Sequence, residues 1–324
     1  MSTEPGRAPP PGAARFSRRQ WRQIAAITVA AVGVFALLRW LPTGTNLSHM
    51  DFRVDAKNSI DFCDPLNPQF IPVVAVRSPV LMALDAPPAR AGAPWRARLT
   101  LRTASGKPIA PEDLLVVHTR LLHLLIVDPT LTDYQHVHPE PTRTPGEWGF
   151  SFTPRHAGTY RIFADFTPVA TGRGLYANAD LEIEGAADGA ATPGEAERPG
   201  ADASGAPLAV ERDGYRFSLV VGTRPIRARQ PADLRFVVTR PDGGRVPMEP
   251  IMGAFAHLVA FDAARSGFAH LHPMEIDLAK APDAVRPELN FKITIPRAGR
   301  YAIWAQLNLG GRETFVPFWF DVVE

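Results

Sequence analysis

Two stretches of the chain repeat one arrangement of histidines. Residues 123–140 read HLLIVDPTLTDYQHVHPE, and residues 257–274 read HLVAFDAARSGFAHLHPM. In both, a His is followed by four apolar residues, an Asp, seven further residues and then His-x-His-Pro. Imidazole nitrogens bind zinc and copper, so each copy predicts a metal site. The candidate ligands are His123, His136 and His138 in the first copy, and His257, His270 and His272 in the second.

The loop of a predicted hairpin decides whether the three histidines of a copy meet. Two histidines two positions apart on a strand share one face. If Asp128 pairs with Asp133 across a four-residue loop, His123 lies opposite His138 on the neighbouring strand. Directly opposed Cβ atoms are about 5 Å apart, so all three imidazoles share a face. A three- or five-residue loop would instead turn His123 to the other face. The second copy has the same spacing and the same two alternatives.

The other polar and sulfur-containing residues of the copies have separate predicted roles. Asp128 and Asp262 are at odd spacing from the first histidine of each copy, and we expect them to cap the turn rather than bind metal. The second copy adds the soft thioethers of Met248, Met252 and Met274, which favour Cu(I). The first copy has no methionine at the aligned positions. The second copy is therefore predicted to be the principal metal site.

A structural interpretation of the same residues stays open. Paired histidines in a β-sandwich can bond to backbone carbonyls and brace a hairpin, and methionines beside a strand can be core residues. His118 and His156 have no histidine counterpart in the second copy and are expected to be surface or turn residues.

An enzymatic role is not expected. The sequence contains no Gly-rich phosphate loop and no nucleophile elbow. Its one cysteine, Cys63, lies outside the repeated segments, so neither copy has the Cys ligand of a blue-copper site. A single cysteine also excludes an intramolecular disulfide framework. Cys63 could pair between chains, bind metal or be a buried thiol.

The composition limits the class of protein. The chain has 324 residues, of which 45% are hydrophobic, and a net charge of +2, which gives no case for nucleic-acid binding. Its 33 prolines favour loops and short strands over long helices.

The N-terminal region predicts a membrane anchor. Residues 1–23 are expected to be a disordered basic cytoplasmic tail, and residues 24–41 a transmembrane helix with Trp21 and Trp40 at the two interfaces. The arginines before the helix place the rest of the chain outside the cytoplasm. A cleaved signal peptide is the rival interpretation, although Arg39 and Trp40 follow the apolar run where a cleavage site would be expected. Residues 17–21 also match part of a twin-arginine signal.

The remainder predicts an all-β fold of two tandem immunoglobulin-like β-sandwiches. Short alternating strands with turn residues between them fill residues 70–184, and the same pattern fills residues 209–324. A juxtamembrane segment, 42–69, precedes the first domain, and an Ala/Gly/Pro-rich flexible linker, 185–208, separates the two. Both domains contain Ala-Gly-x-Tyr, which resembles the tyrosine corner of immunoglobulin-like sandwiches.

The anchor and paired sandwiches resemble uncharacterised bacterial envelope proteins of the YtkA-like sort. The residues that carry the resemblance are His257, 268–273 and 298–304, with His123, 134–139 and 157–163 in the first copy. The resemblance implies the sandwich fold and a single-pass inner-membrane location with periplasmic domains. Periplasmic copper carriers share the architecture, which is a fold analogy alone.

Two functions from different classes are therefore expected. The first is a membrane-anchored periplasmic protein that binds copper, with zinc as the less favoured metal, for trafficking, sensing or delivery. The alternative is a non-catalytic interaction module of an envelope complex, which would bind a protein partner through exposed sheet edges.

Overall fold

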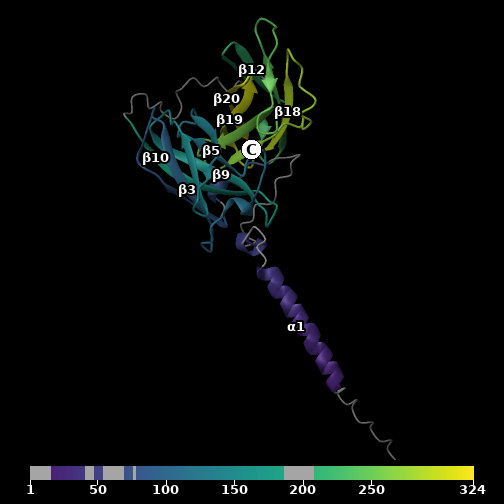
Figure 1. The fold of residues 1–324 in the computed structure, drawn as a ribbon. Helices are drawn as coiled ribbons and strands as arrows, with labels where there is room; N and C mark the ends of the chain where they lie inside the picture. Colours follow the sequence, from purple (N-terminus) through teal and green to yellow (C-terminus); the bar gives the residue numbers. More distant parts are fainter. Residues whose placement is uncertain (1–15, 41–46, 54–68, 76–77, 186–207) are drawn as a thin grey trace, which may run out of the picture. The chain divides into compact units, whose positions relative to one another are not determined.

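The structure is a computed structural model that describes residues 16–40, 47–53, 69–75, 78–185 and 208–324. Cys63, most of the expected basic tail and nearly all of the expected linker lie outside these residues. The expected fold class is confirmed: two repeated β-sandwiches follow a single N-terminal apolar helix within the described part of the chain (Figure 1).

The apolar helix α1 spans Arg18–Trp40. The prediction of disorder up to residue 23 is therefore wrong for residues 18–23. The helix starts early because Ser17 N–H donates to Gln20 Oε1 at 2.8 Å while Gln20 N–H donates to Ser17 Oγ at 3.3 Å, a reciprocal cap of the first turn. Arginine and glutamine are also good helix formers. With a mean hydropathy of 1.7, α1 is long and apolar enough to cross a membrane, a property that signal sequences share.

The first sandwich consists of two mainly antiparallel sheets. One has the strand order β1-β3-β8-β7, and the other has the order β2-β10-β9-β5-β6, with β4 also paired to β9. The strands are β1 (Val80–Asp85), β2 (Ala89–Arg90), β3 (Trp95–Thr103), β4 (Leu114–Leu115), β5 (Leu122–Val127), β6 (Tyr134–Val137), β7 (Glu140–Pro141), β8 (Glu147–Phe152), β9 (Gly158–Pro168) and β10 (Leu175–Glu184).

The second sandwich repeats this topology. Its sheets have the orders β11-β12-β14-β18 and β13-β20-β19-β16-β17, with β15 paired to β19. The strands are β11 (Leu208–Arg212), β12 (Tyr215–Val221), β13 (Ile226–Arg227), β14 (Pro231–Thr239), β15 (Met248–Glu249), β16 (Ala256–Asp262), β17 (Phe268–Leu271), β18 (Glu288–Thr294), β19 (Gly299–Leu309) and β20 (Arg312–Val323). Figure 1 shows the first sandwich in blue to teal and the second in green to yellow.

Among the described residues, three short 3-10 helices lie outside the sheets: η1 (His49–Phe52), η3 (Val73–Ala75) and η4 (Pro111–Asp113). Phe52 is buried in the core of the first sandwich. Phe70, by contrast, is buried in the core of the second sandwich and packs edge-to-face on Tyr301, with ring centroids 5.5 Å apart. Phe70 precedes β1 of the first sandwich in the sequence but thus packs in the second sandwich.

The tyrosine corners resemble one another without being identical. In the second sandwich the Tyr301 hydroxyl donates to the carbonyl of Arg297, four residues upstream, at 3.0 Å. In the first, the Tyr160 hydroxyl accepts from His156 N–H at 3.0 Å and donates to the Asp133 carboxylate at 2.7 Å. Both tyrosines are buried and tie down the turn before their strand, as the Ala-Gly-x-Tyr pattern predicts.

Both predicted hairpins have the four-residue loop. Asp128 N–H donates to Asp133 O at 3.1 Å, and Leu125 pairs with His136 in the ladder between β5 and β6. The second hairpin has the corresponding register, with Val259 opposite His270. The three histidines of each copy therefore share one face of their sheet.

The aspartates cap the turns, as predicted. The Asp128 carboxylate accepts from the backbone N–H groups of Thr130, Thr132 and Asp133, at 3.2, 2.8 and 2.9 Å. The Asp262 carboxylate accepts from Ser266 N–H at 2.6 Å. These bonds fix the loop length, and with it the strand register that aligns the histidines.

A third apolar cluster lies between the two sandwiches. Every residue of β5 is buried, because Leu124 and Ile126 enter the core of the first sandwich while Leu125 and Val127 enter this third cluster. Strand β16 is buried on both faces in the same way. The buried members of the cluster are Ile71, Val73, Leu125, Val127, Leu131, Tyr134, Phe163, Val259, Phe261, Phe268, Ala302, Trp304 and Trp319.

Polar contacts across this interface are reciprocal. Leu131 and Arg265 occupy equivalent positions in the two hairpin loops, and both have positive φ, 62° and 51°. The carbonyl of Leu131 accepts from the Trp304 indole at 3.2 Å, and that of Arg265 accepts from the Arg161 guanidinium at 2.9 Å. Each loop is thus bonded by the other sandwich, so the two copies face each other through equivalent surfaces.

Candidate metal centre

The histidine triplets lie on the sheet faces that form this interface. His123 on β5 shares a face with Leu125 and Val127, and His136 on β6 shares a face with Tyr134. The second triplet is carried in the same way by β16, β17 and the residues that follow. In each triplet one nitrogen from every ring lies within 4.8 Å of the others. This is the arrangement that the repeated spacing predicts.

The first triplet has its ligand nitrogens oriented by the protein. His123 Nε2 lies 3.0 Å from the carbonyl oxygen of Val117, and His136 Nδ1 lies 2.7 Å from Gln306 Oε1. The opposite nitrogens of these two rings, His123 Nδ1 and His136 Nε2, lie 3.0 Å apart. His138 Nε2 is buried without a hydrogen-bond partner among the described residues. Three nitrogens thus remain to face a shared ion.

The second triplet repeats this donor set atom by atom. His257 Nε2 lies 3.0 Å from the carbonyl oxygen of Ile251, and His270 Nδ1 lies 3.1 Å from Asp165 Oδ2. The remaining nitrogens, His257 Nδ1, His270 Nε2 and His272 Nε2, are all buried and have no hydrogen-bond partner in the described part of the chain. Metal-binding histidines commonly donate their other N–H to a carbonyl or carboxylate in this manner.

The surroundings keep these imidazoles neutral, which is the form that binds metal. Burial lowers the pKa of His138 to about 4 and that of His257 to about 3. Burial and the neighbouring histidines hold the pKa values of His136, His270 and His272 well below 6.5.

His118 was not among the predicted ligands, and the expectation of a surface or turn residue is wrong in part. It lies in a tight turn with φ 48°, but its ring stacks on that of His272 in the other sandwich, with centroids 3.6 Å apart. Its centroid is also 5.9 Å from that of His257 and 6.3 Å from that of His123. The aligned residue of the second copy is a methionine, so the repeat gave no signal for His118.

Asp165 and Gln306 were also not among the predicted site residues. Both are at the same place in their sandwiches, in β9 beside His123 and in β19 beside His257. Each bonds to a histidine of the opposite sandwich. The signal that could have found them is the match between the Gly-x-Tyr segments that begin β9 and β19, since each residue lies seven positions after the Gly.

The three candidate methionines lie in different surroundings. Met248 packs against the core of the second sandwich, so a ligand role for it gains no support. Met274 is 57% exposed. Met252 has φ 49° and occupies the position equivalent to His118.

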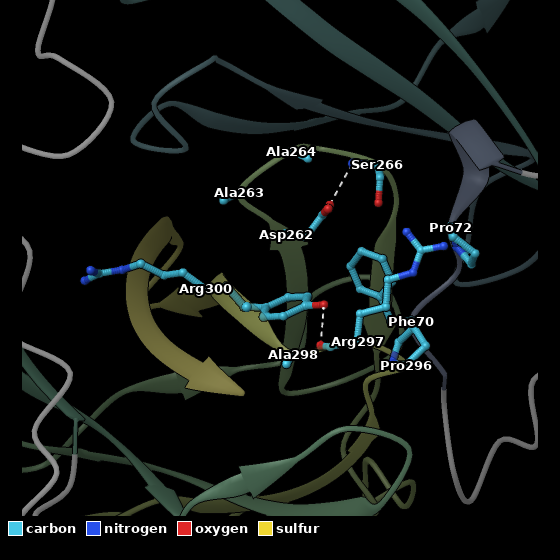
Figure 2. A pocket seen from close by; sticks show the side chains of 12 residues that line it. Phe70, Pro72, Asp262, Ala263, Ala264, Ser266, Pro296, Arg297, Ala298 and Arg300 are labelled. Atoms are coloured by element: carbon cyan, nitrogen blue, oxygen red, sulfur yellow. Dashed lines mark hydrogen bonds between the residues drawn. The ribbon is translucent and has the colours of Figure 1, made fainter. Parts of the chain in front are cut away.

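A pocket of about 210 Å³ lies at the far end of β16 from His257 (Figure 2). It is lined by Phe70, Asp262, Tyr301 and the turn before β19. Figure 2 shows Asp262 bonded to Ser266. The Tyr301 hydroxyl donates to the carbonyl of Arg297. Both of these bonds fix turns, and the pocket is separate from the histidines.

Comparisons with known proteins give the family and distant structural likenesses. No curated protein sequence matches the chain. Among solved structures, the FdeC adhesin of Escherichia coli is similar over 76% of this chain at 13% identity and a TM-score of 0.22, and this chain spans 64% of its length. Domains 4 and 5 of the S-layer protein SbsC are 12% identical over 76% of this chain and 98% of theirs, with a TM-score of 0.20.

The fibronectin(III)-like modules of Clostridium thermocellum CbhA are 9% identical over 75% of this chain and 93% of theirs, with a TM-score of 0.19. Likenesses this distant carry no argument about function, and the resemblance to YtkA-like proteins stays a prediction. A family model described as a domain of unknown function matches residues 79–185 and again residues 209–324. With two matches that cover most of its length, the chain belongs to this family, DUF8832.

Proposed function

We propose that the protein binds metal ions at the interface of its two sandwiches, copper in preference to zinc. One observation carries the proposal: in both triplets three imidazole nitrogens converge within 4.8 Å. In four of the six rings, the nitrogen that does not converge with the others lies within hydrogen-bond distance of an oxygen acceptor. A hairpin brace would need only the bonds to Val117 and Ile251. It would not explain the buried, unpartnered nitrogens of the second triplet.

The three nitrogen donors limit which metals the site would bind and what role it would have. Three neutral nitrogens suit copper and zinc, and they leave a coordination position open for exchange. A site of this kind fits a protein that takes up, senses or passes on an ion. A non-enzymatic role agrees with the absence of a recognisable nucleophile from the sequence.

We further propose that α1 anchors the protein in a bacterial inner membrane with the sandwiches in the periplasm. Its 23 residues would extend about 35 Å, enough to cross a hydrocarbon core of about 30 Å. Protease added outside intact spheroplasts should then digest the sandwiches. A mature protein that starts after residue 40 would show instead that α1 is a signal sequence.

Metal analysis of the full-length chain, purified in detergent without a His tag, tests the binding. The wild type should hold copper or zinc near stoichiometrically, and the double variant His270→Ala with His272→Ala should lose most of it. His49, an exposed histidine outside the triplets, provides the matched control His49→Ala. Equal metal contents in wild type and double variant, or a wild type that refuses both ions, would contradict the proposal.

A second candidate function, an interaction module, is favoured by one observation. The segment after β17 exposes several apolar side chains: Met274 at 57%, Ile276 at 84%, Leu278 at 40% and Val285 at 46%. Exposed apolar side chains close in sequence can mark a protein-binding surface. A metal-free wild-type protein that folds normally would favour this function over metal binding.

A further inference from the structure

The two triplets are as close to each other as the rings within each triplet. Within the triplets, ring centroids are 4.7 to 5.5 Å apart. Across the interface, the His136 and His270 centroids are 5.4 Å apart, and those of His123 and His270 are 5.8 Å apart. Ions bound by the two triplets would therefore be neighbours inside one shell of histidines.

Each triplet has one ring that is oriented by an acceptor from the other sandwich. His136 of the first sandwich is oriented by Gln306 of the second, and His270 of the second is oriented by Asp165 of the first. The Gln306 amide donates in turn to the Glu313 carboxylate, which leaves its oxygen to accept from His136. Docking of the two sandwiches thus orients one predicted ligand in each triplet.

The charges around the two triplets differ. Asp165 accepts from His270 of the second triplet and lies opposite His123 of the first in the ladder between β9 and β5. The equivalent residue, Gln306, is neutral. The positive charge of Arg120 acts on both His123 and His138 of the first triplet. The residue equivalent to Arg120 is Ala254. Arg120 therefore disfavours a cation at the first triplet, whereas the second triplet has the direct bond from His270 to Asp165 and an alanine in place of the guanidinium.

Charge also decides which pair of ions can be held together. Two divalent ions repel one another about four times as strongly as two monovalent ions at the same separation and dielectric constant. Asp165 is the one carboxylate that bonds to a triplet histidine among the described residues. A bound cation favours its ionised form, yet a single negative charge balances a pair of monovalent ions far better than a divalent pair.

We propose that the triplets form one binuclear centre that holds two Cu(I) ions but only one divalent ion tightly, at His257, His270 and His272. This inference rests on the proposed metal binding and specifies its stoichiometry. Loading at the second triplet with Zn²⁺ should weaken binding of a second Zn²⁺ at the first, because the two ions share one buried region.

Titration of the metal-free full-length chain tests the centre. Anaerobic competition with a chromophoric chelator should give two Cu(I) ions per chain, whereas calorimetry with Zn²⁺ should give one tight ion and a second at least about tenfold weaker. Failure to bind either ion would overturn the metal-binding function as well. Two equivalent, independent Zn²⁺ sites would overturn only the binuclear centre.

Two matched substitutions test the charge argument. Asp165→Asn keeps an oxygen that can accept from His270 but removes the charge, and it should weaken the tight Zn²⁺ by about 10- to 100-fold. Gln306→Glu adds a negative charge at the equivalent position and should strengthen the second Zn²⁺. A purely structural role for these residues would make both substitutions weaken binding, and that result would overturn the assignment. Circular dichroism of each variant checks that the fold is retained.

Discussion

The two nitrogens of an imidazole have separate roles in this centre. His123 and His257 each direct Nε2 at a backbone carbonyl, which leaves Nδ1 to face the proposed ion, while His136 and His270 do the reverse through side-chain acceptors. The acceptor therefore selects the tautomer, and the tautomer selects the ligand atom. The rings stay neutral because burial opposes their charge.

This burial predicts a loss of stability in acid for the metal-free protein. The pKa of His138 is lowered from 6.5 to about 4, and that of His257 to about 3. Between pH 6.5 and about 4 the unfolded chain therefore binds more protons than the folded one, so the free energy of unfolding decreases as pH falls through this window. Each unit of lowered pKa corresponds to about 1.4 kcal/mol per group.

Denaturant unfolding of the metal-free chain at several pH values measures this effect. His138→Asn with His272→Asn should flatten the pH dependence, because these two rings can no longer take up protons on unfolding. A wild type equally stable at pH 7 and pH 4.5 would show that the histidines are not buried as described.

Met252 gives a second prediction at the residue scale. It occupies the position of His118 with the same backbone conformation, and His118 stacks on His272 of the opposite sandwich. The reciprocal interface therefore leads us to expect Met252 over His138 of the first triplet, not beside the second. Met252→Leu should weaken Cu(I) at the first triplet and leave the tight Zn²⁺ unchanged. Met274→Leu, at an exposed position, is the control and should change neither.

At the scale of elements, the two hairpins set the geometry of the ligands. The loops after β5 and β16 keep four residues because an aspartate at the end of each strand accepts from the loop backbone. A change of loop length by one residue would turn the first histidine of the triplet away from the other two.

Asp128→Ala should therefore affect both stability and metal binding. Three backbone N–H groups would lose their acceptor, at a cost of about 2 to 3 kcal/mol in the free energy of unfolding. Asp262→Ala removes the acceptor of the bond from Ser266 N–H and should cost about 1 kcal/mol. Urea denaturation of the two variants compares these losses. Equal losses would mean that the additional bonds of Asp128 do not stabilise its loop.

At the scale of the whole molecule, the interface between the sandwiches is a third core. Strands β5 and β16 are buried on both faces, as strands between two packed layers must be. The same interface that buries Phe163, Phe261 and Trp304 brings the two triplets together.

Trp304→Ala tests the dependence of the centre on docking. Trp304 is 2% exposed, and its indole bonds to the carbonyl of Leu131 across the interface. Its removal should cost about 3 to 5 kcal/mol and lower metal affinity at both triplets, because the ring packs on Tyr134 across the interface that brings the triplets together. Trp304→Phe keeps much of the packing and should retain metal binding. Unchanged affinity in Trp304→Ala would show that each triplet binds without docking.

The sequence by itself determined the strands, the repeat and the composition of each triplet, because these depend on local spacing. The turn-capping role of Asp128 and Asp262 followed from the same spacing, whereas the four-residue loop was one of the alternatives that the spacing left open. The start of α1 at Arg18 was not predicted, because it depends on the cap formed by Ser17 and Gln20 and not on hydropathy.

Only the tertiary structure decided that the triplets face each other. The contacts of His118, Asp165 and Gln306 join residues more than 100 positions apart, and no local pattern encodes such a pairing. A signal was present in residues 121–127, LLHLLIV, which are apolar except for His123. Such a run predicts a strand buried on both faces. It could show that a second surface covers β5, but not which one, because packing between sandwiches depends on the shape of both faces together.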